Sequence, residues 1–403
     1  MTEHLYYHDS FLYEFDADVV GVSREPNSLV LDRTAFYPTS GGQVFDTGWI
    51  VAGDGKLRVT EVVEQDDGTI LHLIEGAAVL QPGTRVHGQI DVERRRDHMQ
   101  QHSGQHVLSA AFVQLFNMPT VSFHMGAESC SIDLDTKNLT AAQVEAAENL
   151  ANDVVMQDRP VGIRFVTQEE AQGLGLRKTP PVERDKLRLI DIQDFDLTAC
   201  GGTHVASTGQ IGCILLRKTE KVRQGWRVEF VCGKRAVATA RHDYATLAES
   251  AALSSSHIWD LPQQIRKFQE EARASRKAGE QLQEELAGLH ADQVLSEIPE
   301  TGGRKVFFRV FPDRDLSYIK LLAQKLTRQN PNVIALLATT CAQPTLVFAQ
   351  SAGQPFDMGA LMKETLAELG GRGGGSKDMA QGGPTKIEAI AGKLAEITAK
   401  LRG

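Results

Sequence analysis

The sequence predicts a multidomain α+β protein: an N-terminal β-barrel-like domain, an α+β zinc-containing domain, a helical hairpin and a small C-terminal α/β domain. Three observations predict it. The chain has 403 residues, which is too long for one ordinary domain. The first 95 residues alternate short apolar runs with turn signals, whereas residues 234–300 carry apolar side chains at helical spacing. The content of 41% hydrophobic and 24% charged residues is that of a soluble globular protein.

The N-terminal domain is expected at residues 1–95. Strand-like runs such as 28–31 and 57–63 are separated by Asp-Gly and Pro-Gly turns. Within this domain, Ser40-Gly41-Gly42-Gln43 forms a turn whose glycines let the backbone approach a ligand closely. The local sequence fits equally an ordinary β-turn that places Phe36 and Tyr37 in the core.

The second domain is expected at residues 96–233. Apolar residues recur at helical intervals over 91–116, and a second helix is expected over 140–156 with Thr140 as its N-cap. Arg94, Arg95 and Arg96 oppose the dipole at the start of the first helix, so we expect them to serve a ligand. Further elements are expected in this order: strands 120–123, 129–133 and 161–167, a short helix 169–174, and strands 187–192, 211–217 and 227–231.

Residues 234–300 are expected to form a helical hairpin or a short coiled coil. Helices are predicted over 235–252 and 260–295, the second with a 3-4 alternation of apolar residues that Ser275 and Gly279 weaken. This seam suggests a homodimer through the helical region or the C-terminal domain, and a monomer with a folded-back hairpin fits equally well.

The last domain is expected at residues 301–403, with the element order βαββαα. Strands are predicted over 306–310, 333–337 and 345–349, and helices over 318–329, 358–369 and 384–401. Between the last two helices lies Gly370–Gly383, whose glycine density leaves backbone N–H groups free for a phosphate or a sugar. We predict a binding loop there, with a flexible linker as the alternative.

Two short motifs about a hundred residues apart carry metal-binding chemistry. His102-Ser103-Gly104-Gln105-His106 places two imidazoles on one face of a helix. Cys200-Gly201-Gly202-Thr203-His204 reads as a tight loop that returns a thiol and an imidazole to one point. Three imidazoles and one thiolate are ligands that Zn²⁺ prefers. The pattern therefore predicts one metal site closed by tertiary folding.

Charge and cysteine content limit the function classes. A net charge of −9 argues against a general nucleic-acid coat, but basic clusters within 177–188 and 217–235 flank the Cys200 motif and suggest a locally bound polyanion. Ordinary solvated surface charge is the alternative. Five cysteines, few and odd in number, favour a reducing compartment, with the cytoplasm as the default. No apolar run approaches the roughly 20 residues of a membrane span.

Together these residues resemble the editing domain of alanyl-tRNA synthetase. The resemblance rests on the two metal motifs, the run Thr198–Gly212, and Leu31-Asp32-Arg33-Thr34-Ala35-Phe36-Tyr37 followed by Ser40–Gln43. The segment Gly370–Gly383 resembles the C-terminal domain of the same synthetase. The chain opens directly on the editing β-domain, so it is most similar to the freestanding long-form AlaX-type proteins. It departs from the synthetase pattern at Gln105, where a threonine is usual.

The resemblance implies an aminoacyl-tRNA hydrolase that removes serine, and in some members glycine, from mischarged alanine tRNA. It also implies one Zn²⁺ per chain. The resemblance implies the metal ligands His102, His106, Cys200 and His204, and it places Thr34 in the substrate pocket. Together with the basic and glycine-rich segments, it leads us to predict the catalytic candidates Thr34, His102 and Cys200, and the substrate- or tRNA-binding candidates Gly41, Gly42, Gln43, Arg223, Arg227, Arg372, Gly374 and Lys377.

Two rival functions stay open from the sequence. The editing domain of threonyl-tRNA synthetase carries a similar His/Cys/His set and acts on seryl-tRNA of the threonine type. The other rival is a non-catalytic tRNA-binding module with a structural zinc, because four protein ligands close a tetrahedral site that a catalytic zinc normally leaves open.

Overall fold

The computed structural model describes residues 2–24, 27–76, 80–177 and 186–402. The chain divides into two compact units, Met1–Glu249 and Ser250–Gly403. Among the described residues, no helix is long and apolar enough to cross a membrane.

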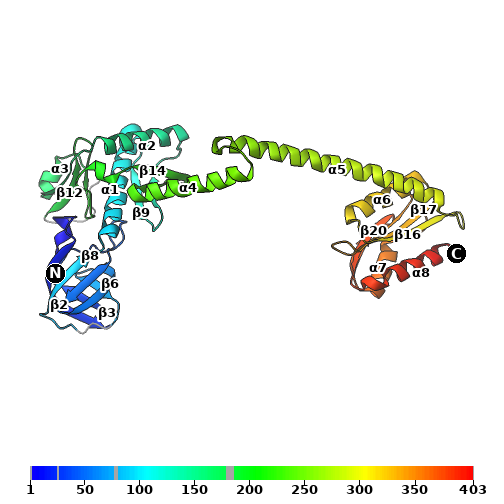
Figure 1. Ribbon diagram of the computed structural model, residues 1–403, viewed down its shortest axis with the longest axis horizontal. Coiled ribbons are helices and arrows are strands. Elements are labelled where there is room, and N and C mark those ends of the chain that lie inside the picture. Colours follow the sequence, from blue (N-terminus) through cyan, green and yellow to red (C-terminus); the bar gives the residue numbers. More distant parts are fainter. Residues whose placement is uncertain (1, 25–26, 77–79, 178–185, 403) are drawn as a thin grey trace. The chain divides into compact units, whose positions relative to one another are not determined.

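A closed six-stranded barrel occupies the start of the first unit, as the sequence predicts (Figure 1). Alternate side chains of its strands, among them Phe15, Leu29, Ile50 and Val62, fill the interior. A short parallel pair, β1 (Glu3–His4) and β4 (Arg33–Thr34), lies beside it. In hydrogen-bonded order the barrel strands are β2 (Glu14–Arg24), β3 (Asn27–Leu31), β7 (Ile70–Ile74), β6 (Gly55–Glu64), β5 (Gly48–Ala52) and β8 (Arg85–Ile90).

The α+β part of this unit is built around helix α1 (Val92–Phe116). Every residue of α1 from Gln101 to Phe112 is buried, so its polar side chains lie inside the protein. Helix α2 (Ala141–Met156) packs beside it and begins as predicted, with Thr140 Oγ1 accepting from the backbone N–H of Gln143 at 3.3 Å.

Two antiparallel sheets and a short helix complete this part. The strand β13 (Asp196–Ala199) was not expected from the sequence. The four-stranded sheet has the order β14 (Ile214–Val222), β15 (Gly225–Cys232), β10 (Cys130–Leu134) and β9 (Thr120–Met125). The three-stranded sheet has the order β11 (Val161–Val166), β12 (Leu187–Ile192) and β13 (Asp196–Ala199), with α3 (Gln168–Gln172) after β11.

The helical region contains α4 (Gly233–Leu253) and α5 (Leu261–Glu297), both close to the predicted bounds. These helices fall almost entirely in different compact units, so the hairpin stays a prediction. The predicted boundaries at 95, 233 and 300 likewise stay predictions.

The C-terminal sheet is covered on both faces. Helices α5 and α6 pack against one face, and α7 and α8 against the other, so β17 is buried along its whole length. In order across the sheet, the strands are β16 (Lys305–Phe311), β17 (Val333–Thr339), β18 (Thr345–Gln350), β20 (Met379–Pro384) and β19 (Gly371–Gly375). The covering helices are α6 (Leu316–Gln329), α7 (Met358–Leu369) and α8 (Ile390–Arg402).

One sequence prediction about this unit is wrong. The segment Gly370–Gly383 is not a loop, because most of it forms the edge hairpin β19–β20 and the element order becomes βαββαββα. The glycines are required by packing: a Cβ on Gly373 would lie 2.6 Å from Leu366 Cδ1 of α7, and one on Gly382 would lie 2.4 Å from the same atom.

Candidate metal and ester-hydrolysis site

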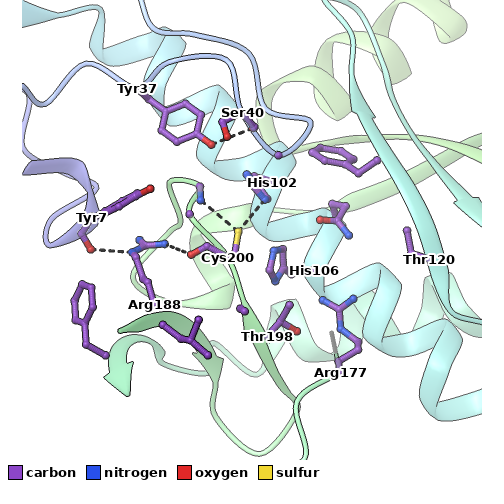
Figure 2. A pocket seen from close by; sticks show the side chains of 18 of the residues that line it. Tyr7, Tyr37, Ser40, His102, His106, Thr120, Arg177, Arg188, Thr198 and Cys200 are labelled. Atoms are coloured by element: carbon purple, nitrogen blue, oxygen red, sulfur yellow. Dashed lines mark hydrogen bonds between the residues drawn. The ribbon is translucent and has the colours of Figure 1, made fainter. Parts of the chain in front are cut away.

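The structure brings together the four residues of the two metal motifs. Successive turns of α1 present His102 and His106, and the loop after β13 presents Cys200 and His204. Their ligand atoms all lie within 4.8 Å of one another, and all but Cys200 are buried residues. Cys200 Sγ lies 3.4 Å from His102 Nε2 (Figure 2) and 3.3 Å from His204 Nε2.

These distances fit a tetrahedral zinc centre. Zn–N and Zn–S bonds of about 2.0 to 2.3 Å place two ligand atoms of a tetrahedron about 3.5 Å apart. Metal-bound histidines characteristically donate their other ring N–H to a fixed acceptor. Whether the three imidazoles are oriented in this way is therefore a test of the fit.

Each imidazole has its Nδ1 turned to a protein group. His102 Nδ1 lies 2.7 Å from Gln43 Oε1, which also accepts from the backbone N–H of Thr203 and therefore receives the imidazole proton. His204 Nδ1 lies 3.2 Å from Ser103 Oγ, and His106 Nδ1 lies 3.6 Å from Asp196. The residues thus fit Zn²⁺, with three Nε2 atoms and one sulfur as its ligands.

The electrostatics of the cluster support a thiolate. Burial opposes ionisation of Cys200, but His102, His204 and His106 outweigh it and hold the thiol pKa well below its usual value. Burial lowers the pKa of His204 to about 3, so this imidazole is neutral and its lone pair is available to a metal.

Asp196 supports His106 from the side away from the sulfur. Burial opposes its ionisation, but His106 and Arg177 hold the pKa of its carboxyl well below the usual range. Arg177 donates Nε–H to Asp196 Oδ1 at 2.6 Å, and Thr198 Oγ1 donates to Oδ2 at 3.0 Å. The His106 pKa is raised, because Cys200 and Asp196 outweigh its burial.

The conformation of the Cys200 loop depends on Gly202 and on Arg188. A Cβ on Gly202 would lie 2.1 Å from His102 Cε1, so only glycine lets this loop pass the imidazole. Arg188, on β12, donates to the Cys200 carbonyl at 2.6 Å and to the Tyr7 carbonyl at 2.8 Å. It therefore ties the loop to the N-terminal segment (Figure 2).

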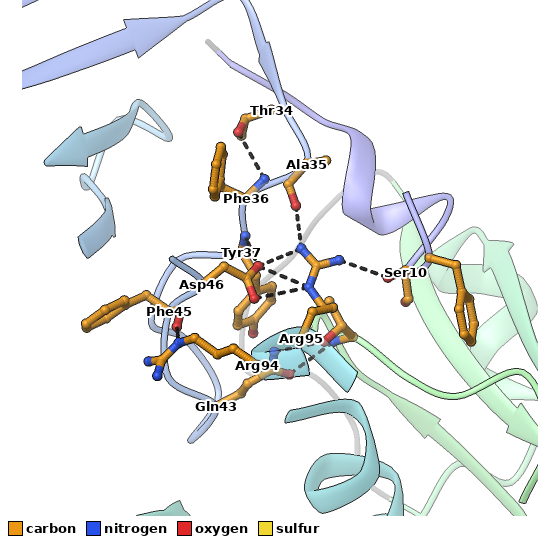
Figure 3. A network of polar contacts seen from close by, with 12 residues as sticks. Ser10, Thr34, Ala35, Phe36, Tyr37, Gln43, Phe45, Asp46, Arg94 and Arg95 are labelled. Atoms are coloured by element: carbon orange, nitrogen blue, oxygen red, sulfur yellow. Dashed lines mark hydrogen bonds and ion pairs between the residues drawn. The ribbon is translucent and has the colours of Figure 1, made fainter. Parts of the chain in front are cut away.

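A buried ion pair fastens the barrel segment 34–46 to α1 (Figure 3). Arg95 donates to both oxygens of Asp46 and to the carbonyls of Ser10 and Ala35. Asp46 in turn accepts from the backbone N–H of Tyr37 at 2.7 Å. The expectation that this arginine serves a ligand is wrong, because its guanidinium is fully buried against protein acceptors.

The cluster opens into a pocket of about 980 Å³. That volume lies at the upper end of the range for small-molecule sites. Its cations are Arg177, Lys186 and Arg188, from the basic cluster that the sequence singled out; Lys178 and Arg184 of that cluster lie outside the described residues. Aromatic and hydroxyl side chains form a further part of its wall: Tyr7, Tyr37, Ser40, Thr120, Ser122, Phe123, Phe165 and Thr198.

The predicted binding residues of the barrel are placed unequally. Gly41 lines the pocket, and Gly42 adopts φ 86° with its Cα close to the Phe123 carbonyl. Gln43 has a fully buried side chain that orients His102, and its predicted contact with a substrate stays a prediction.

Thr34 is fully buried and is not among the described residues that line the pocket. Its hydroxyl lies 2.8 Å from His72 Nε2 and accepts from the backbone N–H of Phe36. His72 Nδ1 donates to the Leu29 carbonyl, so in the neutral ring Nε2 accepts the Thr34 proton. Its predicted contact with the substrate stays a prediction.

The other predicted tRNA-binding residues are not among the described residues that line the pocket. Arg223 is exposed in the β14–β15 turn, and Arg227 on β15 forms a bidentate pair with Asp133. Arg372, Gly374 and Lys377 belong to the second compact unit, and their roles stay predictions.

Sequence reasoning missed three functional positions. Asp196 gave a usable signal, since it stands four residues before Cys200 and two residues before the resembling run Thr198–Gly212. Arg177 and Arg188 were noticed only as members of a basic cluster that suggests a bound polyanion, whereas Arg188 is buried and holds the Cys200 loop. Their roles depend on partners that lie far away in the sequence.

The barrel and the adjoining α+β domain with its three-histidine, one-cysteine cluster define a chain of the aminoacyl-tRNA synthetase accessory type. Residues 12–94 match the family described as "tRNA synthetases class II (A)". Residues 187–228 match the "Threonyl and Alanyl tRNA synthetase second additional domain", and residues 302–403 match the "DHHA1 domain".

Whole-chain relatives narrow this class. The "Alanyl-tRNA editing protein AlaX-L" of Pyrococcus horikoshii is 32% identical over 98% of this chain and 97% of its own length. The chain therefore belongs to the AlaX-L family of alanyl-tRNA editing proteins. The "Alanine--tRNA ligase" proteins of Pyrococcus furiosus and Archaeoglobus fulgidus are each 33% identical to it, and the chain spans 43% and 42% of their lengths.

Solved structures also match this chain. The C-Ala domain of Aquifex aeolicus alanyl-tRNA synthetase matches 27% of this chain and 99% of its own at 20% identity. Its TM-score of 0.25 does not establish a shared fold.

Proposed function

We propose that this chain is a trans-editing hydrolase that cleaves the ester of serine, and of glycine, on mischarged alanine tRNA. The observation that carries the proposal is the cluster of His102, His106, Cys200 and His204, which opens into a pocket of about 980 Å³. Family membership supports the same reaction class.

The need for such a site follows from the chemistry of alanine selection. A synthetase pocket for alanine cannot exclude glycine by size and discriminates against an added hydroxyl by only about 1–3 kcal/mol. A second, hydrolytic site can remove serine that was attached by mistake if it binds the serine hydroxyl through a hydrogen bond. Alanine then leaves the polar partner of that hydroxyl unpaired and is spared.

The chain's own residues supply binding and orientation. Arg177, Lys186 and Arg188 give the pocket wall a positive charge that suits the phosphates of a tRNA acceptor end. Gln43, Ser103 and Asp196 fix the three imidazoles, and Arg188 fixes the Cys200 loop. A zinc ion held by the four ligands would polarise the ester or a water molecule, or position the amino acid.

A deacylation assay tests the function directly. Purified full-length protein is mixed with seryl-tRNA of the alanine type, with correctly charged alanyl-tRNA, and with seryl-tRNA of the threonine type. We expect fast loss of serine from the first substrate only. Cleavage confined to the threonine-type tRNA would replace the proposed substrate, and tRNA binding without cleavage of any ester would make the chain a binding module.

We predict that Thr34→Val erodes the preference for serine over alanine. Valine removes the hydroxyl that contacts His72 Nε2 and the Phe36 N–H. The substitution therefore removes the group that would bind the serine hydroxyl, or it shifts the segment that leads to Tyr37. Thr34→Ser, which keeps the hydroxyl, is the control. If Thr34→Val cleaves seryl- and alanyl-tRNA in the wild-type ratio, Thr34 has no part in specificity.

We also propose self-association through α5. One face of this helix, with Ala287, Ala291 and Val294, packs in the C-terminal unit. A different face leaves apolar side chains exposed, which a second copy of the helix would cover: Ile265, Phe268, Leu282, Leu286 and Leu289. Sedimentation of the wild type and of Leu286→Glu tests this; a monomeric wild type contradicts it.

The proposed reaction takes place where charged tRNA is found, and we therefore assign it to the cytoplasm. The Zn²⁺ assignment is testable by metal analysis of the purified protein, with one ion per chain as the expected result.

A further inference from the structure

Two aromatic rings meet at the rim of the pocket. His8 follows the first short helical turn, and Phe165 lies on β11. Their centroids are 5.1 Å apart and their planes are tilted by 32°, which is closer to stacking than to an edge-on contact. Both residues line the pocket, both are exposed, and Phe165 keeps 43% of its surface accessible.

Strand pairing links this rim to the reactive cluster. Phe165 lies directly opposite Arg188 in the antiparallel β11–β12 pair, so both side chains project from the same face of the sheet. Arg188 holds the Cys200 carbonyl at 2.6 Å. Phe165 is thus the cross-strand neighbour of the arginine that holds the Cys200 loop.

The aromatic pair suits one kind of ligand. A single exposed apolar side chain needs no explanation. Here, however, the His8 ring packs on one face of the Phe165 ring and leaves its other face open, beside the three cations of the pocket. Arg188 also has a buried Nη2 that finds no hydrogen-bond partner among the described residues. An open aromatic face together with positive charge is the arrangement that binds a nucleobase and its phosphate in single-stranded nucleic acids.

We propose that Phe165, backed by His8, is the stacking platform for the adenine of the terminal adenosine that carries the aminoacyl ester. This rests on the proposed function, since an aminoacyl-tRNA presents its ester on that nucleoside. Stacking at the rim holds the ribose over the pocket and leaves the amino acid to enter towards Cys200.

The test measures binding with two hydrolysis-resistant probes. The first is 3′-deoxy-3′-serylamino-adenosine, in which an amide replaces the ester. The second is the same serylamino sugar with hydrogen in place of the base. Calorimetric Kd values are compared for the full-length wild type, Phe165→Ala, Phe165→Trp and Val121→Ala. Val121 is the matched control, because it is an exposed apolar residue that lines the pocket from β9.

We expect Phe165→Ala to weaken binding of the adenosine probe by about 10-fold or more, and to leave binding of the base-free probe unchanged. Phe165→Trp should bind the adenosine probe at least as tightly as the wild type, and Val121→Ala should match the wild type with both probes. Equal binding of the adenosine probe by wild type and Phe165→Ala, an equal loss for both probes, or no binding to the wild type would overturn the platform.

Failure of the platform is distinguishable from failure of the proposed function. If the wild type binds the adenosine probe through Phe165 but does not deacylate seryl-tRNA, the platform stands and the hydrolase function is wrong. If the wild type deacylates seryl-tRNA and Phe165→Ala keeps both its KM and its probe affinity, the platform alone is wrong.

Discussion

Two glycine-rich segments of this chain look alike in sequence and differ in what their glycines do. In the Cys200 loop, Gly202 leaves space for an imidazole: a Cβ there would lie 2.1 Å from His102 Cε1. In the β19–β20 hairpin, Gly373 and Gly382 leave space for Leu366, an apolar side chain of α7. Glycine in the first segment makes room for a metal-ligand candidate, whereas glycine in the second makes room for a core side chain.

The comparison teaches that glycine density alone does not identify a binding site. In each segment the missing Cβ is explained by a side-chain atom that lies where it would be: His102 Cε1 comes from a distant part of the chain, and Leu366 Cδ1 comes from the helix that precedes the hairpin. Each segment is also anchored by one buried glutamine, Gln43 for the Cys200 loop and Gln350 for the start of the hairpin turn. Paired substitutions in the two segments therefore separate chemical from structural roles.

The largest effect is expected from removing the sulfur. Cys200→Ala should lose bound zinc and lower the deacylation rate by about 100-fold or more, because one ligand and the cluster's negative charge are gone. Cys341→Ala, in the other compact unit, should keep both zinc and rate. Zinc content per chain and single-turnover deacylation are the measurements. Full activity of metal-free protein would remove the metal from the mechanism.

The two glycine segments give the next contrast. Gly202→Ala should lower the deacylation rate by about 10- to 100-fold, because its Cβ displaces His102 from a centre that tolerates little misplacement. Gly374→Ala meets its nearest side-chain atom only at 4.0 Å and should leave deacylation and stability near wild type. A drop in tRNA affinity for Gly374→Ala would restore the predicted binding role of the hairpin.

The sequence predicted most of the fold. Helical periodicity identified α1 and α2, and the cap at Thr140 fixed where α2 begins. The ligand set was visible because each pair of ligands is local: His102 and His106 share a helix face, and Cys200 and His204 share a loop.

The remainder depends on tertiary contacts that no local pattern shows. Gln43 lies 59 residues from His102, and Asp46 lies 49 residues from Arg95. Before folding is known, a glutamine after two glycines looks like a ligand-binding residue, and three arginines at a helix start look like an anion site. In the structure Gln43 and Arg95 are buried and join the barrel to α1, whereas Arg94 is only partly buried and Arg96 is exposed.

The two anchoring glutamines test this difference. Gln43→Leu should weaken zinc affinity and the deacylation rate by about 10- to 100-fold, since His102 loses the acceptor of its Nδ1 proton. Gln350→Leu removes donors to the Phe356 and Lys377 carbonyls and should cost about 1–3 kcal/mol of stability in the C-terminal unit without any loss of zinc. Zinc titration and urea unfolding distinguish the outcomes, and equal zinc loss in both variants would contradict the comparison.

The smallest effect concerns the pH dependence of the barrel that carries Gln43. Burial lowers the pKa of His72 to about 4 from its ordinary value of 6.5. Between these pH values His72 is protonated in the unfolded chain and neutral in the folded barrel. The free energy of unfolding of the barrel therefore falls as the pH falls from about 6.5 to about 4, by up to about 3 kcal/mol. His72→Gln keeps an amide donor and acceptor near Leu29 and Thr34 without titrating. We therefore expect its urea midpoint to fall less than that of the wild type between about pH 7 and about pH 4.5. Parallel midpoints for the two proteins would show that His72 does not set this dependence.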